Sequence, residues 1–260
     1  MNRLAGKVAI ITGAAKGLGE ADARRFAEEG ATVILADVDD ATGGAVAAAL
    51  GGTAEYVHLD VRREAEWAAL IDDVVARHGR LDILVNNAGV VELGSPESVT
   101  EADYRFIMAV SVDGVVFGTK HAIRVMRSAG GGAIVNMASI AAVQGEANVA
   151  AYCAAKGAVD AYTRATAVHC AQNGLNIRCN SVLPGGIDTP MVRSLPAKME
   201  KVTDSSVTLE QAAATNRLGD PVDVANLVLF LASDESRFIN GQSHLIDDAA
   251  SVTTGSTAPR

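Results

Sequence analysis

Short aliphatic and β-branched runs alternate along this chain with longer alanine-rich stretches, and this alternation restricts the possible folds more than any other feature. The apolar runs predict seven strands: Lys7–Thr12, Thr32–Asp37, Ala54–Leu59, Leu81–Asn86, Ala133–Ala138, Asn176–Val182 and Ser243–Asp247. The intervening stretches predict helices near 18–29, 40–50, 64–78, 102–129, 150–172 and 221–232. Most of the predicted strands are continuously apolar, which is typical of strands buried on both faces. The sequence therefore predicts an α/β fold, a parallel sheet with helices on both sides.

The 260 residues show no repeat, no low-complexity tract and no break in composition. We therefore expect a single domain over residues 1–250. The stretch 184–220 is polar, punctuated by proline and long for a simple connection, which predicts a substrate lid at about 187–216. The last residues, 251–260, are rich in Ser, Thr and Gly and predict a mobile tail.

Charge and composition exclude several classes of partner. The formal net charge of −9 argues against nucleic acid, whose binding needs a basic face. The sequence shows neither a signal pattern nor an apolar run of about 18 residues, so we expect no membrane partner and a cytoplasmic location. The three cysteines lack CxxC spacing and suggest reduced thiols. The five histidines have no metal-ligand spacing, so no metal site is predicted.

A glycine-rich run, Thr12-Gly13-Ala14-Ala15-Lys16-Gly17-Leu18-Gly19, follows the first predicted strand and opens the first predicted helix. Glycines at 13, 17 and 19 allow a tight turn, a close approach of backbone to pyrophosphate, and close helix packing. The helix start then offers free N–H groups and a positive dipole end to phosphates. The run predicts a dinucleotide site that includes Lys16 and Leu18.

The second predicted strand ends at Asp37, eighteen residues after Gly19. A carboxylate there can accept hydrogen bonds from the ribose hydroxyls of NAD and repels the 2′-phosphate of NADP. Lys16 is a contrary signal, because a cation in the loop could pair with that phosphate. Val38 rather than a basic residue follows Asp37, so the sequence favours NAD over NADP.

Two further strand ends carry ligand-type residues. Asp60 and Val61 end the third strand, where an adenine ring would lie, and Asn86-Asn87-Ala88-Gly89 ends the fourth. Ligands in open α/β sheets bind at these carboxyl ends of the strands. We therefore add Asp60, Val61, Asn87, Ala88 and Gly89 to the predicted cofactor site.

Ser139 ends the fifth strand, and Tyr152 and Lys156 follow in the next predicted helix. Their four-residue spacing places Tyr152 and Lys156 on one helix face. A positive charge at about 4 Å is worth on the order of 4 kcal/mol at an effective dielectric near 20, enough to lower a phenol's pKa from about 10 toward neutrality. We expect Tyr152 to act as general acid/base, Lys156 to acidify it, and Ser139 to hold a substrate oxygen.

Together these motifs resemble the short-chain dehydrogenase/reductase family over nearly the whole chain. The matching elements are TGAAKGLG at 12–19, Asp37, Asp60, NNAG at 86–89, Ser139, YCAAK at 152–156 and PGGIDTP at 184–190. The resemblance implies a Rossmann-type doubly wound, seven-stranded sheet in the order 3-2-1-4-5-6-7 and a homotetramer. It implies interconversion of secondary alcohols and ketones with a nicotinamide cofactor. It also places Pro184, Gly185, Ile187 and Thr189 at the cofactor, and Tyr152 and Lys156 at the nicotinamide ribose.

The chain departs from the family at two places. Ser111 occupies the position of a catalytic asparagine that bends the helix before the fifth strand and holds a water in the proton path. Serine keeps a hydroxyl with a shorter reach, and we retain Ser111 as a catalytic candidate. Near the C-terminus, Asp247-Asp248-Ala249 replaces a common Asp-Gly-Gly, which leaves the geometry of that turn open.

Substrate choice is expected to depend on Ser139, Gln144, Gly186, Met191 and Leu195. The apolar set Met191, Val192, Leu195 and Met199 would suit an apolar cyclic or steroid-like alcohol, although the same stripe could instead pack a lid onto the sheet. Two other functions remain open. An NADP-dependent ketoreductase of the 3-oxoacyl type is favoured by Lys16 and opposed by Asp37, and a non-enzymatic nucleotide-binding regulator is opposed by the presence of both Tyr152 and Lys156.

Overall fold

The computed structural model describes residues 2–199 and 218–253 and contains a seven-stranded sheet in the order β3-β2-β1-β4-β5-β6-β7. All six strand pairs are parallel. The strand bounds are β1 Val8–Thr12, β2 Thr32–Asp37, β3 Ala54–His58, β4 Ile83–Asn86, β5 Gly132–Met137, β6 Ile177–Pro184 and β7 Ser243–Ile246. The predicted Rossmann-type topology is confirmed, and no strand end differs from the predicted one by more than two residues.

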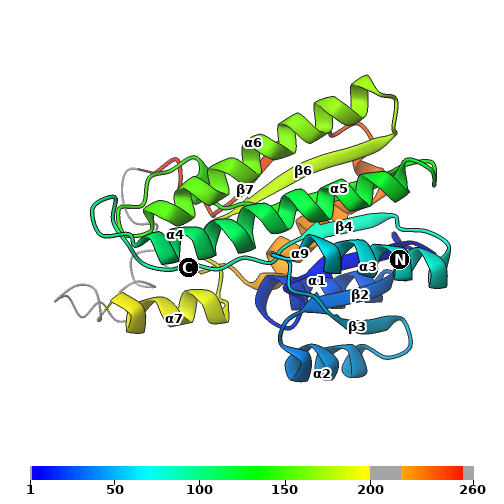
Figure 1. The fold of residues 1–260 in the computed structure, drawn as a ribbon, viewed down its shortest axis with the longest axis horizontal. Helices are drawn as coiled ribbons and strands as arrows, with labels where there is room; N and C mark the ends of the chain where they lie inside the picture. The colour runs from blue at the N-terminus through cyan, green and yellow to red at the C-terminus, as the bar shows by residue number, and fades with distance from the viewer. Residues whose placement is uncertain (1, 200–217, 254–260) are drawn as a thin grey trace.

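Helices cover both faces of the sheet (Figure 1). Side chains of α1, α2 and α9 share one hydrophobic cluster with alternate strand residues such as Ile11 and Leu35. Side chains of α3, α5 and α6 share a second cluster with the intervening residues, such as Ile10 and Ile34. The helix bounds are α1 Gly17–Glu28, α2 Asp40–Leu50, α3 Glu64–His78, α4 Glu101–Met108, α5 Gly114–Met126, α6 Ala150–Gln172, α7 Pro190–Met199 and α9 Pro221–Ala232. Because consecutive strand residues point to opposite faces, continuously apolar strands supply both clusters.

Local capping residues fix where several helices begin and end. Thr100 accepts a hydrogen bond from the backbone of Asp103 and starts α4. Asp220 and Asp223 form a capping box around Pro221 at the start of α9. Gly79 ends α3 with φ +74°, a left-handed conformation that glycine adopts at little cost. These capping residues therefore set the end of α3 and the starts of α4 and α9.

The helix predicted over 102–129 is interrupted. A π-helical turn, η1, runs over Ala109–Asp113 between α4 and α5. Such a turn inserts one extra residue into the helical ladder and bends the helix locally. The combined run Glu101–Met126 is long and apolar enough, by length and composition, to span a membrane, which corrects the expectation that no run approaches this length. It is partly buried in the protein, where α5 packs against α3 and α4 against α6.

The predicted lid and tail are described only in part. Helix α7, which contains Pro196, forms the first part of the lid region. Residues 200–216 of the lid and 254–260 of the tail lie outside the described residues. The division into one domain, a lid and a mobile tail stays a prediction.

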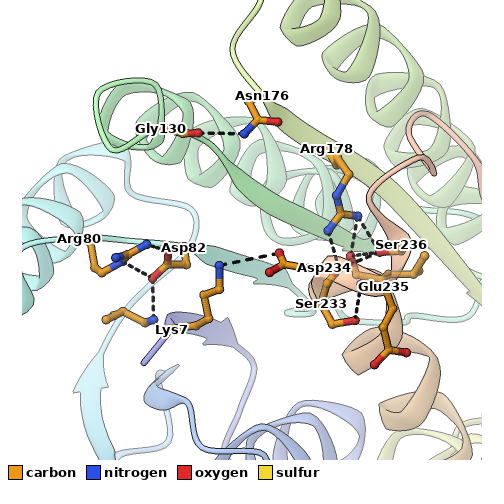
Figure 2. A network of polar contacts seen from close by, with 12 residues as sticks. Lys7, Arg80, Asp82, Gly130, Asn176, Arg178, Ser233, Asp234, Glu235 and Ser236 are labelled. Atoms are coloured by element: carbon orange, nitrogen blue, oxygen red, sulfur yellow. Dashed lines mark hydrogen bonds and ion pairs between the residues drawn. The ribbon is translucent and has the colours of Figure 1, made fainter. Parts of the chain in front are cut away.

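A network of polar contacts joins the amino-terminal ends of several strands (Figure 2). Arg178, near the start of β6, donates to the carbonyls of Leu231 and Ser233 at 2.8 and 3.0 Å and to the Ser236 hydroxyl at 2.8 Å. Its guanidinium thereby satisfies carbonyls at and just beyond the end of α9, which have no intrahelical partners. Asp82, just before β4, accepts hydrogen bonds from the Val8 amide and from Arg80. At the amino-terminal edge of the sheet, these side chains therefore satisfy the hydrogen-bonding groups of the neighbouring backbone.

Candidate active site

A cleft of about 720 Å³ opens at the carboxyl edge of the sheet. It brings together residues predicted from seven separate stretches of sequence. The predicted residues that line it are Gly13, Lys16, Gly17, Leu18, Asp37, Asp60, Val61, Asn87, Ala88, Gly89, Ser139, Tyr152, Lys156, Pro184, Gly185, Ile187, Thr189 and Met191. The strand order places these loops side by side, because β1 and β4 are neighbours at the point where the order reverses.

The glycine loop is held by close backbone packing. Gly13 has φ +64°, and a Cβ built on it would lie 2.9 Å from the Cα of Ala88. A Cβ on Gly19 would lie 2.3 Å from the carbonyl oxygen of Gly13. The Asn87 side-chain amide donates to the carbonyls of Thr12 and Gly13 at 2.9 and 3.2 Å. Gly19 does not line the cleft, so its role in this structure is the close helix packing that was predicted for one of the glycines.

The start of α1 fits an anionic ligand. Its N-cap residue, Lys16, makes no side-chain hydrogen bond to the helix, whereas Asp39 caps α2 and Thr100 caps α4. Gly17 and Leu18, at the first turn of α1, line the cleft. Uncapped N–H groups at a helix start that faces a cleft suit phosphate oxygens. The start of α1 therefore has the free N–H groups and the polarity that suit the pyrophosphate of a dinucleotide.

Asp37 lies at the end of β2 with its carboxylate already oriented. One oxygen accepts from the Ala15 amide and the other from the Asp39 amide, both at 3.0 Å. These two bonds leave further lone pairs on each oxygen for ribose hydroxyls. The Lys16 ammonium lies 3.9 Å from the Asp39 carboxylate and pairs with it. Lys16 thus has an acidic neighbour in its own loop region.

The buried side chain of Lys156 extends from α6 to β5 of the sheet. Its ammonium donates to the Met137 carbonyl at 2.7 Å and lies 5.5 Å from the centre of the Tyr152 ring. A Cβ on Gly89 would lie 3.3 Å from it, so glycine at 89 leaves room for the ammonium. Tyr152 and Lys156 do share one helix face, as their spacing predicts.

The electrostatic expectation for Tyr152 is not met in this structure. Burial raises the pKa of the Tyr152 phenol, a hydrogen bond with Ser139 acts in the lowering direction, and Cys153 adds to the raise. Burial also lowers the pKa of Lys156 to about 8. Both shifts disfavour the charged form, because a low-dielectric surrounding penalises charge of either sign. In this structure burial is therefore the largest influence on the pKa of Tyr152, and it raises that pKa rather than lowering it.

Ser139 and Ser111 contribute hydroxyls from different elements. Ser139 lies just after β5, where its oxygen accepts from the Ala141 amide at 3.2 Å. Ser111 lies in the π-turn η1, is fully buried and has no hydrogen-bond partner for its hydroxyl among the described residues. The same Cβ position on Gly89 lies 3.7 Å from the Ser111 oxygen. Ser111 is thus near Lys156 but behind the cleft wall rather than in its lining.

The turn that replaces Asp-Gly-Gly keeps a glycine-type backbone without glycine. Asp248 and Ala249 have φ +47° and +68°. A Cβ on Gly185 would lie 2.8 Å from the Cβ of Asp247, so this turn packs directly against the cleft. Left-handed backbone at a residue with a Cβ costs roughly 1–2 kcal/mol. The chain tolerates that strain beside its candidate active site.

The predicted substrate residues are only partly gathered. Met191 and Ser139 line the cleft, whereas Gln144, Gly186 and Leu195 do not. Gln144 and Gly186 are exposed, and the side chain of Met199 lies outside the described residues. The substrate roles of Gln144, Gly186 and Leu195 stay predictions that the lining of the cleft does not support.

Sequence reasoning missed several residues that line the cleft. Val90, Val91 and Glu92 directly follow the NNAG tetrad, so their proximity to the motif was a usable signal. Lys198 of α7 donates to the Val91 carbonyl and the Glu92 carboxylate at 2.7 and 2.8 Å, a pairing that joins residues far apart in the sequence. Arg62 and Phe106 also line the cleft and had no motif to reveal them. Over residues 2–199 and 218–253, no group of three or more His, Cys, Asp or Glu is placed to hold a metal ion.

Comparison with known proteins agrees with this geometry. A family model described as enoyl-(acyl carrier protein) reductase matches residues 13–249. A 3-alpha-(or 20-beta)-hydroxysteroid dehydrogenase of Mycobacterium bovis is 38% identical over 245 residues, which is 94% of this chain and 89% of the relative. The chain belongs to the short-chain dehydrogenase/reductase family.

Two further members bear on fold and cofactor. The crystal structure of levodione reductase superposes with a TM-score of 0.88 at 32% identity, covering 96% of this chain and 99% of the other. An NADP-dependent (R)-specific alcohol dehydrogenase of Lentilactobacillus kefiri is 37% identical over 95% of this chain and 97% of the relative. Short-chain dehydrogenase/reductases use NAD or NADP and act on CH–OH groups or the corresponding ketones, and this chain is an oxidoreductase of that kind.

Proposed function

We propose that this short-chain dehydrogenase/reductase interconverts a secondary alcohol and a ketone with NAD(H), and that its substrate is apolar and cyclic or steroid-like. One observation carries the proposal: Ser139, Tyr152 and Lys156 line the same cleft as the uncapped start of α1 and the carboxylate of Asp37. This shared lining supports the proposal, because a phenol, a hydroxyl and uncapped helix N–H groups all border one cavity.

The chain's own residues would perform the proton chemistry. In alcohol oxidation, the Ser139 hydroxyl donates a hydrogen bond to the substrate oxygen while Tyr152 removes the hydroxyl proton. A bound oxidised nicotinamide would supply the hydride acceptor for the carbinol carbon and a positive charge that favours the phenolate. Lys156 would hold the nicotinamide ribose, and its ammonium, 5.5 Å from the centre of the Tyr152 ring, would pass a proton from Tyr152 toward the buried hydroxyl of Ser111. In ketone reduction Tyr152 donates the proton instead.

The preference for NAD rests on Asp37. Its oriented carboxylate can accept from both ribose hydroxyls, and a 2′-phosphate would place like charges together in a half-buried site. Lys16, the contrary signal, already has Asp39 as a partner. The NADP-dependent relative keeps the alternative of an NADP-dependent ketoreductase of the 3-oxoacyl type in view. The non-enzymatic regulator is the weakest candidate, because the acid/base residues are all present.

The substrate class rests on the apolar lining near Tyr152. Val90, Val91, Met191 and Val192 line the same cleft as Tyr152, and one relative is named a 3-alpha-(or 20-beta)-hydroxysteroid dehydrogenase. The charged lining residues Glu92 and Lys198 pair with each other, which favours an apolar substrate over a polar sugar. A homotetramer, expected from the family resemblance, and a cytoplasmic location, expected from the sequence composition and patterns, accompany this proposal.

A coupled substrate screen tests the function. The purified protein is mixed with NAD or NADP and a panel of cyclic, steroid and linear secondary alcohols, and reduced cofactor is followed by its absorbance. We expect NADH formation with cyclic or steroid alcohols and at least a 10-fold lower kcat/KM with NADP. Turnover with NADP alone would overturn the assignment of Asp37, and no turnover with any alcohol or ketone would overturn the function.

A further inference from the structure

At the adenosine end of the cleft, the side chain of Arg62 is fixed by Asp60. The Arg62 Nε donates to one carboxylate oxygen at 2.8 Å and Nη2 donates to the other at 2.7 Å. The Arg62 backbone amide donates to the first oxygen at 3.1 Å. A planar, bidentate pair holds a guanidinium in one orientation better than a single contact does. Asp60 therefore spends much of its hydrogen-bonding capacity on Arg62, although the sequence suggested that it serves the cofactor directly.

The fixed guanidinium lies over an aromatic ring from another element. The Arg62 Cζ atom is 5.9 Å from the ring centre of Phe106, which belongs to α4. Both residues line the cleft. Phe106 is 38% exposed, and Val38, which also lines the cleft, is 58% exposed. This end of the cleft thus combines a planar cation with exposed apolar surface, a chemistry suited to a flat aromatic ligand.

We propose that Arg62 and Phe106 form the wall that covers the adenine ring of the dinucleotide, and that Asp60 is the positioning residue that fixes Arg62. The inference rests on the proposed function, because it takes the cleft as a dinucleotide site. The guanidinium stacks on the base through its plane, and its pairing with Asp60 reduces its attraction to the phosphates. Adenine recognition in this chain therefore depends on a residue of α4, the helix that leads into the π-turn η1.

Two neighbouring residues provide matched controls. Arg63 follows Arg62 and also lies near Asp60, at 3.4 Å, but it is not part of the cleft lining. Tyr104 is an exposed aromatic residue on α4, like Phe106, and is likewise outside the lining. Arg63→Met and Tyr104→Ala therefore repeat the loss of charge and of aromatic surface without removing the proposed wall.

The test measures adenosine and AMP as inhibitors competing with NADH. Arg62→Met and Phe106→Ala should each weaken both inhibitors by about 3- to 30-fold, the range for a partly exposed cation–π or stacking contact. Arg62→Lys should behave like Arg62→Met, because lysine keeps the charge and loses the plane. Arg63→Met and Tyr104→Ala should change neither inhibition constant more than about twofold. Thermal melting of each variant confirms that it is folded.

The role of Asp60 is tested by coupling. Asp60→Asn should weaken adenosine binding in the wild-type background and have no further effect in the Arg62→Met background, which a merely structural role would not produce. Equal adenosine binding by Arg62→Met and Arg63→Met would overturn the inference, and so would a loss confined to AMP, which would assign Arg62 to the phosphate. If the wild-type protein bound no dinucleotide, the proposed function would fail as well. Tight wild-type binding with unchanged variants would contradict the adenine wall alone.

Discussion

The amino-terminal and carboxyl ends of the parallel strands form two opposite edges of the sheet, and their polar side chains differ in how well they are paired. At the amino-terminal edge, Arg178 donates to backbone carbonyls at the end of α9, and Asp82 accepts from the backbone amide of Val8. These bonds satisfy both the side chains and the backbone groups. At the carboxyl edge, Lys156 is buried with a lowered pKa, Ser111 has a hydroxyl with no partner among the described residues, and Ala249 adopts a left-handed backbone. The comparison indicates that stability is concentrated at one edge and that strain is tolerated at the other, where the ligand would bind.

The physical reason is that only one of the two edges of an open parallel sheet binds ligands. Ligands bind at the carboxyl ends of the strands, so groups there must keep hydrogen-bonding capacity free for a partner. Free capacity and buried charge cost folding free energy. The amino-terminal edge carries no such demand, and its polar groups can pair with each other. Substitutions at the carboxyl edge should therefore change activity and often raise stability. Substitutions at the amino-terminal edge should lower stability and leave activity nearly unchanged.

The largest effect is expected for Tyr152→Phe. Removing the phenolic oxygen should lower kcat by about 100- to 10 000-fold, because general acid/base catalysis contributes on that scale. NADH binding, measured by fluorescence, should stay within about threefold. Tyr162→Phe, a partly exposed tyrosine on the same helix, should keep its kcat within about twofold. A Tyr152→Phe enzyme with wild-type turnover would contradict the acid/base assignment.

Arg178→Met tests the opposite edge. It should lower the free energy of unfolding by about 3 kcal/mol, because two carbonyls and a hydroxyl lose a charged donor. Urea denaturation measures this loss, and kcat should remain near the wild-type value at a temperature where the variant is folded. Arg127→Met, at an exposed arginine, is the control. Equal stability of the two variants would contradict the claim that the amino-terminal edge stabilises the fold.

Lys156→Met should abolish most activity and yet stabilise the protein. The pKa of Lys156 falls from 10.5 to about 8 on folding, so the unfolded chain binds the proton more tightly. The cost of burying the charge, about 3 kcal/mol, is fully present below pH 8 and disappears as the pH rises through about 10.5. Allowing about 1 kcal/mol for the lost bond to the Met137 carbonyl leaves a gain of about 2 kcal/mol at pH 7.

The pH dependence of that gain is the decisive measurement. Denaturation at several pH values should show the advantage of Lys156→Met shrinking between pH 8 and 10.5. Lys120→Met, at an exposed lysine paired with Glu64, should show no such advantage. A variant less stable than wild type at pH 7 would mean that Lys156 supports the fold rather than burdening it.

The smallest effect is expected for Ala249→Gly. Glycine removes the cost of a left-handed backbone at φ +68° and should raise stability by about 1 kcal/mol, seen as a small increase in Tm. Ala250→Gly is the matched control and should be neutral or slightly destabilising, since Ala250 is not among the residues with positive φ. A stabilising Ala250→Gly together with a destabilising Ala249→Gly would show that the turn is not strained.

Local patterns explain what the sequence could predict. The strands were visible because strands buried on both faces are apolar without interruption, and the glycine loop and Tyr152–Lys156 pair were visible because short spacings fix their geometry. The π-turn around Ser111 was hidden inside a continuous helical pattern, since one inserted residue hardly changes the periodicity. The raised pKa of Tyr152 was also missed, because the spacing shows that Lys156 is near and does not show how strongly the packing around the phenol disfavours its charged form.

Pairs that depend on packing stayed out of reach. Arg62 with Phe106, Lys198 with Glu92, and Arg178 with the end of α9 join residues that are separated by tens of positions in the chain. Each of these residues looks like an ordinary surface charge or apolar residue in the sequence. Only the arrangement of the layers makes them neighbours.

The strand order also bears on how the chain can be assembled during synthesis. Once β1 to β3 have formed, β4 pairs with β1, and β5, β6 and β7 each pair with the strand completed just before. Every later strand therefore joins an edge that already exists, without any earlier pair having to open. The nucleotide loop and Asp37 belong to the part made first, whereas Ser139, Tyr152 and Lys156 emerge from the ribosome later. A growing chain could thus build the cradle for the dinucleotide before it possesses the groups that would use it.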